Sequence, residues 1–148
     1  VFTKAEIESR YEITLENYCK TVNIEALTMV DMARKDILPA VVGYTKELTE
    51  SYIAKKNSVP TLPAKYESKV IERLSTLTDE IDEAADALEK VTLDYKSISD
   101  VTKASEMIRD TMLGKMAELR IACDEAETLV SKKYWPFPTY GDLLFGVR

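Results

Sequence analysis

Histidine is absent from this chain of 148 residues, and glycine occurs only four times. The absence of histidine excludes His-dependent general base catalysis, Ser–His and Cys–His nucleophile pairs, and the common zinc sites. It also excludes a ferritin-like di-iron bundle, which needs a Glu-x-x-His motif on two helices. The glycines are scattered at positions 43, 114, 141 and 146, so no glycine-rich loop is present to cradle a phosphate.

The chain also has no excess of positive charge and no long apolar run. The formal net charge is −6 and the isoelectric point is about 4.8, which is the opposite of the basic footprint of a nucleic-acid binder. An anionic membrane surface is disfavoured for the same reason. No run of 18 apolar residues is available to span a bilayer, and the N-terminus does not resemble a signal peptide. We therefore expect no nucleic-acid partner and no membrane partner.

The two cysteines, Cys19 and Cys123, are too few and too far apart for a disulfide framework or a metal site. Each falls on the apolar stripe of a predicted helix. We interpret them as small core residues in a reducing, cytoplasmic environment. The chain starts at Val1 rather than at a methionine, so we expect it to be cut from a longer protein.

What the chain does contain is long amphipathic helix. Its 45% hydrophobic and 31% charged residues are typical of an all-α protein. We predict an antiparallel bundle of three long helices over residues 1–133, with helices at about 3–56, 64–98 and 101–132. Thr3 and Glu6 form a capping box at the start of the first helix. Pro39 is expected to kink that helix, and the alternative is a split near Asn23 that folds back as a fourth helix.

The predicted helices differ in length, and the difference predicts an uncovered end. At 1.5 Å per residue the first helix spans roughly 75–80 Å and the second about 50 Å. The first turns of the first helix, with Ile7, Tyr11 and Leu15, are therefore expected to project with their apolar stripe uncovered. We interpret this end as a candidate docking surface for a missing domain.

The last fifteen residues, 134–148, form an aromatic tail with the only Trp and two of the three Phe residues. Leaving such a tail in water costs roughly 25 cal/mol per Å² of apolar surface, so we expect it to dock. Two targets stay open: the helices of the same chain, or a larger assembly. The candidate docking residues of the tail are Tyr134, Trp135, Phe137, Tyr140, Leu143, Leu144 and Phe145.

The densest acidic stretch, residues 79–86, does not predict a metal site. It lacks the glycine and the alternating oxygen ligands of a calcium loop. On a helix its carboxylates spread around the outward arc, which is typical of a solvated face. We assign no catalytic, cofactor-binding or metal-binding residue to this chain.

Three segments resemble a known family. Residues 8–29 (ESRYEITLENYCKTVNIEALTM) resemble the start of the C-terminal helical region of type III glutamine synthetases. Residues 134–145 (YWPFPTYGDLLF) are similar to the closing motif of these enzymes, and residues 116–120 (MAELR) are similar too. The resemblance implies a cytoplasmic dodecamer that uses ATP and a divalent metal, Mg or Mn, to make glutamine from glutamate and ammonia. In the family the ligands of these groups lie upstream, and no such motif is matched here.

Two functions are consistent with these observations. The first is a structural or assembly domain of a glutamine synthetase, not catalytic by itself, whose catalytic domains are absent from this chain. Its partners would be the catalytic domain of the same polypeptide and neighbouring subunits of a homo-oligomer. The alternative is a stand-alone helical module for protein–protein interaction.

Overall fold

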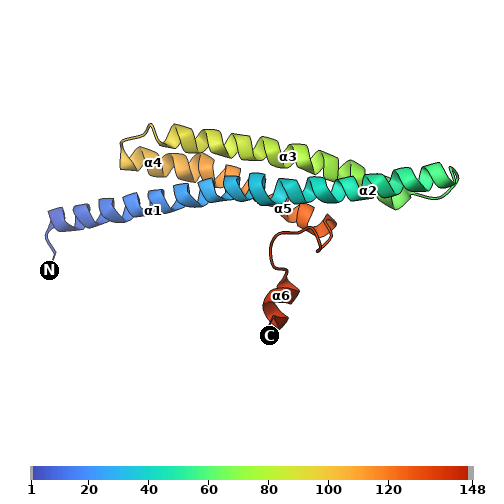
Figure 1. The fold of residues 1–148 in the computed structure, drawn as a ribbon. Coiled ribbons are helices and arrows are strands. Elements are labelled where there is room, and N and C mark those ends of the chain that lie inside the picture. Colours follow the sequence, from blue (N-terminus) through green and yellow to red (C-terminus); the bar gives the residue numbers. More distant parts are fainter. Residues whose placement is uncertain (1, 147–148) are drawn as a thin grey trace. The chain divides into compact units, whose positions relative to one another are not determined.

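The computed structural model describes residues 2–146, except for the side chain of Tyr140. These residues contain helices and no strand, so the predicted all-α class is confirmed. The helical elements follow in chain order (Figure 1): α1 Lys4–Met32, η1 Ala33–Ile37, α2 Leu38–Ser58, α3 Lys65–Tyr95, α4 Val101–Met107, η2 Ile108–Met112, α5 Leu113–Leu129 and α6 Tyr140–Phe145.

The helix ends reflect local hydrogen bonding. Thr3 and Glu6 make the predicted capping box, since the Thr3 amide donates to Glu6 Oε2 at 2.7 Å and the Glu6 amide donates to Thr3 Oγ1 at 3.3 Å. α3 ends at Tyr95, three residues before the predicted limit of 98. There the Ser97 hydroxyl donates to the carbonyl of Asp94 at 2.7 Å, a local bond that competes with the helical pattern.

The alternative of a split near Asn23 is wrong. Asn23 lies inside α1, which runs from Lys4 to Met32 without a glycine or a proline. The flanking side chains of Val22 and Ala26 are both buried, so the apolar face continues through this position. The helix therefore needs no break to keep this apolar face against the core.

The region of Pro39 contains a π-helical turn, η1. The Leu38 amide donates to the carbonyl of Ala33, five residues back, instead of four as in an α-helix. Pro39 has no amide hydrogen, and in an α-helix its ring would clash with the carbonyl of Lys35. The wider turn relieves this clash, and the backbone then continues as α2.

A second π-helical turn, η2, contains no proline that would predict it from the sequence. The Leu113 amide donates to the carbonyl of Ile108, again five residues back. The side chains of Ile108 and Met112 are both fully buried. The extra residue in this turn therefore lies where two large apolar side chains enter the core.

The chain forms two compact units. The first unit consists of residues 1–31 and 84–119, and the second of residues 32–83 and 120–148. The core of the first unit, in chain order, is Cys19, Val22, Ala26, Val30, Ala85, Leu88, Val91, Ala104, Ile108, Met112 and Leu119. The core of the second unit is Ala33, Ile37, Ala40, Val41, Leu48, Ala64, Val70, Leu74, Leu77, Ile81, Ala122, Cys123, Ala126 and Val130.

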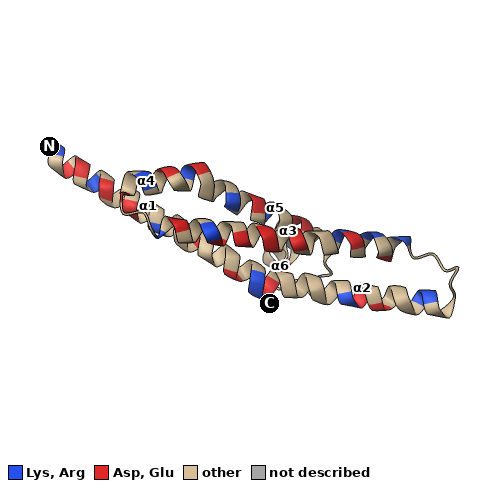
Figure 2. Ribbon diagram, turned by 90° about the horizontal axis from the view of Figure 1, so that it is seen from above, with Lys and Arg blue, Asp and Glu red and all other residues tan. Residues whose placement is uncertain are grey.

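Both predicted core cysteines are thus buried, and burial raises the pKa of the Cys123 thiol to about 11. Charged side chains of both signs are distributed along α1, α3 and α5 (Figure 2). In the second unit, Arg73 links α3 to α5 through a two-pronged contact with Glu125, with both nitrogen–oxygen distances at 2.6 Å. Within residues 2–146, no helix is long and apolar enough to cross a membrane.

Candidate docking surfaces

The start of α1 carries apolar side chains that the first unit leaves uncovered. Ile7 is 56% exposed and Tyr11 is 64% exposed, while Leu15 is half-buried. A groove of about 500 Å³ lies beside them, and Asp100 stands on its opposite wall. The groove is lined by Glu8, Tyr11, Glu12, Leu15, Asp100, Val101 and Thr102.

This groove is acidic, but two of its carboxylates already interact with other groups of the chain. The Asp100 carboxylate caps α4 by accepting a hydrogen bond from the Lys103 amide at 2.9 Å. Glu8 lies 3.6 Å from the ammonium of Lys4 on the exposed surface of α1. Within residues 2–146, no cluster of three or more carboxylate or thiol side chains is arranged to hold a metal ion.

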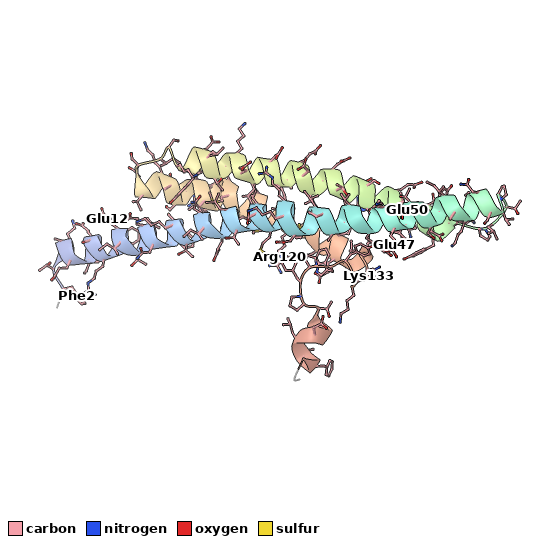
Figure 3. The ribbon with its side chains drawn as sticks, viewed as in Figure 1. Phe2, Glu12, Glu47, Glu50, Arg120 and Lys133 are labelled. Carbon is pink, nitrogen blue, oxygen red and sulfur yellow. The ribbon has the colours of Figure 1, made fainter. Side chains whose placement is uncertain are left out.

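The first half of the aromatic tail is attached to α2 within the second unit. The rings of Tyr134 and Tyr44 pack with their centroids 5.7 Å apart at an angle of 46°. The Tyr134 hydroxyl donates a hydrogen bond to Glu47, and Lys133 Nζ lies 3.4 Å from the same carboxylate (Figure 3). We call the set of Tyr44, Glu47, Lys133 and Tyr134 the tyrosine clasp.

The clasp shifts the pKa values of its members. The hydrogen bond from Tyr134, assisted by the charge of Lys133, lowers the pKa of the Glu47 carboxyl. The same hydrogen bond raises the pKa of the Tyr134 hydroxyl, because ionised tyrosine would lose it beside a negative charge. Burial raises the pKa of Tyr44. The shifts of Glu47 and Tyr134 favour the same arrangement: an ionised Glu47 and a neutral Tyr134.

Trp135 and Phe137 follow the clasp and contact each other. Their rings meet edge to face, with centroids 6.2 Å apart and planes inclined by 76°. Both side chains are half-buried.

The second half of the tail forms α6, a helix that the sequence analysis did not predict. Thr139 and Asp142 make a capping box: the Thr139 amide donates to Asp142 Oδ2 at 3.0 Å and the Asp142 amide donates to Thr139 Oγ1 at 3.3 Å. Lys132 Nζ lies 2.6 Å from Asp142 Oδ1. The hydrogen bond from Lys132 and those from Thr139 lower the pKa of Asp142 to about 2.

The end of α6 is exposed. Leu143, Leu144 and Phe145 have exposed fractions of 69%, 70% and 84%. Three large apolar side chains in a row are therefore presented to solvent. The side chain of Tyr140 lies outside the described part of the structure.

The predicted docking residues thus separate into three groups: those on α1, those between α5 and α6, and those at the end of α6. Ile7, Tyr11 and Leu15 share one face of α1 in the first unit. Tyr134, Trp135 and Phe137 lie between α5 and α6 in the second unit, and only Tyr134 among them has a ring contact with α2. The sequence analysis missed the clasp residues on α2, and the only signal available for α6 was the Thr-x-x-Asp pattern at 139–142.

Comparison with known proteins identifies the class of this helical chain. Residues 1–56 match the family model described as the glutamine synthetase C-terminal domain. The whole chain is 38% identical to a glutamine synthetase of Butyrivibrio fibrisolvens and covers 21% of that protein. It is 30% identical, over 98% of its length, to the type-3 glutamine synthetase of Dictyostelium discoideum, of which it covers 20%. A glutamine synthetase of Bacteroides fragilis (strain YCH46) is 26% identical over 98% of the chain.

The family model defines the class as a C-terminal domain of glutamine synthetases. The chain belongs to this family, and its resemblance to the type-3 enzymes is confirmed. It spans about a fifth of the length of the relatives that it matches.

Proposed function

We propose that this chain is a structural and assembly domain of a glutamine synthetase and is not catalytic by itself. The observation that carries the proposal is the exposed end of α6. Leu143, Leu144 and Phe145 remain in solvent although the tail before them is attached to α2. Because exposed apolar surface costs roughly 25 cal/mol per Å², a partner surface is expected to cover them.

In this proposal the long helices form an antiparallel three-helix bundle, and the tail is its docking arm. The bundle braces the catalytic domain of the same polypeptide, and the tail contacts that domain or a neighbouring subunit. The face of α1 with Ile7 and Tyr11 is a second contact, because its apolar side chains are also uncovered. The homo-oligomer is the dodecamer that the family resemblance implies, in the cytoplasm.

The parent reaction is the ATP-dependent amidation of glutamate with ammonia. We place ATP and the divalent metal outside this chain, because the residues described here do not fit them. The acidic groove beside α1 is the nearest candidate, yet its Asp100 carboxylate is engaged as a helix cap. No step of the reaction is therefore assigned to a side chain of this domain.

The test removes the exposed side chains of α6 in the complete glutamine synthetase that carries this chain. Leu144→Ala and Phe145→Ala should each lower the melting temperature of the oligomer or its size by native mass spectrometry. A large apolar side chain buried in a contact contributes about 2–5 kcal/mol. The matched control is Ile121→Ala, which removes a similarly exposed side chain (69%) from α5.

The proposal fails if the α6 variants and the Ile121→Ala control give the same melting temperature and the same oligomer size. It also fails if the purified chain, with no other domain, forms glutamine from glutamate, ammonia and ATP.

A further inference from the structure

The outward face of α3 carries six exposed residues with symmetric spacing. They lie opposite the buried Leu74, Leu77 and Ile81, and the steps between them are 4, 3, 4, 3 and 4 residues. This spacing keeps a stripe on one face of a helix, as in a coiled-coil seam. The residues of this charge stripe, all within the second unit, are Lys65, Lys69, Glu72, Thr76, Asp79 and Glu83.

The two ends of the charge stripe have opposite signs. Lys65 and Lys69 lie in the first turns of α3, and Asp79 and Glu83 lie further along it. Each end places two like charges four residues apart, which is unfavourable on a helix. The lysines are also unfavourable near the helix N-terminus, where the helix dipole is positive.

No group within residues 2–146 forms an ion pair with these four side chains. The neighbouring charges off the stripe behave differently. Glu67 is engaged by Lys55, and Glu80 is engaged by Arg73 at 3.0 Å. Glu67 and Glu80 thus have an ion-pair partner within the chain, whereas the side chains at the two ends of the stripe have none within residues 2–146.

The charges of the stripe are complementary to the same stripe running in the opposite direction. Lys65 and Glu83 stand nine residues on either side of position 74, and Lys69 and Asp79 stand five residues on either side of it. Glu72 and Thr76 are two residues from the same centre. An antiparallel copy centred on position 74 thus places every lysine opposite a carboxylate.

We infer that α3 is a contact between two copies of this chain, related by a two-fold axis at position 74. Lys65 of one copy pairs with Glu83 of the second copy, and Lys69 pairs with Asp79 of the second copy. The symmetry repeats both pairs, so the contact is isologous. Each paired charge then gains the partner that its own chain does not provide.

A second copy fits the stripe better than an anionic surface does. A membrane or a nucleic acid would attract the lysine end and repel the carboxylate end, which carries the same number of charges. Exposed ion pairs are weak, at about a 1.5- to 5-fold gain in binding constant each. The contact therefore sets the orientation of copies that larger apolar surfaces hold together, and in this respect it rests on the proposed assembly function.

The first experiment traps the contact in the complete oligomeric enzyme. The double variant Lys69→Cys/Asp79→Cys places thiols at positions that face each other across the two-fold axis. Mild oxidation should give a disulfide-linked dimer on a non-reducing gel, with at least a tenfold higher yield than in either single variant. The matched control is Lys65→Cys/Lys69→Cys, whose nearest thiols across the contact stand ten residues, or roughly 15 Å, out of register.

The second experiment tests charge pairing, and its quadruple variant has the same net charge as the unchanged chain. Lys65→Glu/Lys69→Glu makes the whole stripe acidic and should weaken the oligomer about tenfold in sedimentation experiments. Adding Asp79→Lys/Glu83→Lys to the same chain reverses both ends, restores the complementarity and should restore the original affinity. The double variant Asp79→Lys/Glu83→Lys is measured alone as well. If the quadruple variant loses as much affinity as the two double variants lose together, the inference is refuted.

The outcomes also separate this contact from the proposed function. If the α6 variants change the oligomer but no disulfide forms across the stripe, the assembly role stands and the stripe contact is wrong. If the enzyme is a monomer, both are wrong.

Discussion

The two halves of the C-terminal tail are similar in composition and different in how they are held. The first half, residues 134–138, contacts α2 through the ring and the hydroxyl of Tyr134. The second half, α6, is held by its own capping box and by Lys132, and its three apolar side chains stay exposed. An aromatic or apolar side chain is thus buried only where the chain offers a matching surface, and α6 has none within its unit.

Gly43 is part of the surface that receives Tyr134. A Cβ atom at position 43 would lie 3.3 Å from both Cδ1 and Cε1 of the Tyr134 ring. That is closer than ordinary van der Waals contact, so the missing side chain lets the ring approach the α2 backbone. No comparable recess is described for Leu143, Leu144 or Phe145.

The largest loss of stability among these variants should come from breaking the tyrosine clasp. Tyr134→Ala removes the ring contact with Tyr44 and the hydrogen bond to Glu47, and should lower the free energy of unfolding by about 1–2 kcal/mol. Tyr134→Phe keeps the ring and removes only the hydrogen bond, so it should cost less than Tyr134→Ala. Urea denaturation of the chain measures both. Equal losses for the two variants would show that the ring contact contributes nothing.

A smaller effect is expected from acid, and it should act on α6. The pKa of Asp142 is about 2 in the folded chain, below the ordinary aspartate value of about 3.9. A lowered carboxyl pKa stabilises the fold fully above the unfolded value, and this contribution is lost as the pH falls from about 4 to about 2. NMR signals of residues 140–145 should therefore lose helical character in this window.

The matched variant for the acid prediction is Lys132→Gln. It removes the first cause of the low pKa, so the titration midpoint of Asp142 should move upward toward its ordinary value. An unchanged midpoint would show that Thr139 alone holds the carboxylate in its ionised form.

The smallest effect on stability is expected at Gly43, the position on α2 that the Tyr134 ring approaches. Gly43→Ala should stabilise α2 by about 0.5–1 kcal/mol when Tyr134 is also replaced by Ala, because alanine favours the helix. With the native Tyr134 ring in place, the close Cβ contact should remove a few tenths of that gain. A double-mutant cycle measures the difference, and strict additivity would contradict the proposed fit between Gly43 and the ring.

The sequence was sufficient for the helical class and for most helix ends, because those depend on local signals. The Thr3–Glu6 capping box joins residues only three positions apart, and it was predicted correctly. The turn η2 had no such signal. Its geometry depends on how Ile108 and Met112 enter the core, which is a property of the packed structure.

The candidate docking residues were chosen for their apolarity, and apolarity alone does not tell where a side chain goes. Tyr134 and Phe145 were equivalent in the sequence, yet one is part of the clasp and the other is exposed. The difference comes from Tyr44 and Glu47, which are almost ninety residues away along the chain. Contacts at that separation cannot be read from periodicity.

The two π-helical turns have a consequence for the ancestry of this domain. A π-helical turn holds one residue more than the α-helical turn that it replaces, so it is the form in which a long helix accommodates a single inserted residue. The turns before and after it keep their apolar residues on the core side. When related sequences are aligned, one-residue gaps inside the helices are therefore expected at 33–37 and 108–112, and gaps elsewhere in them should be rare.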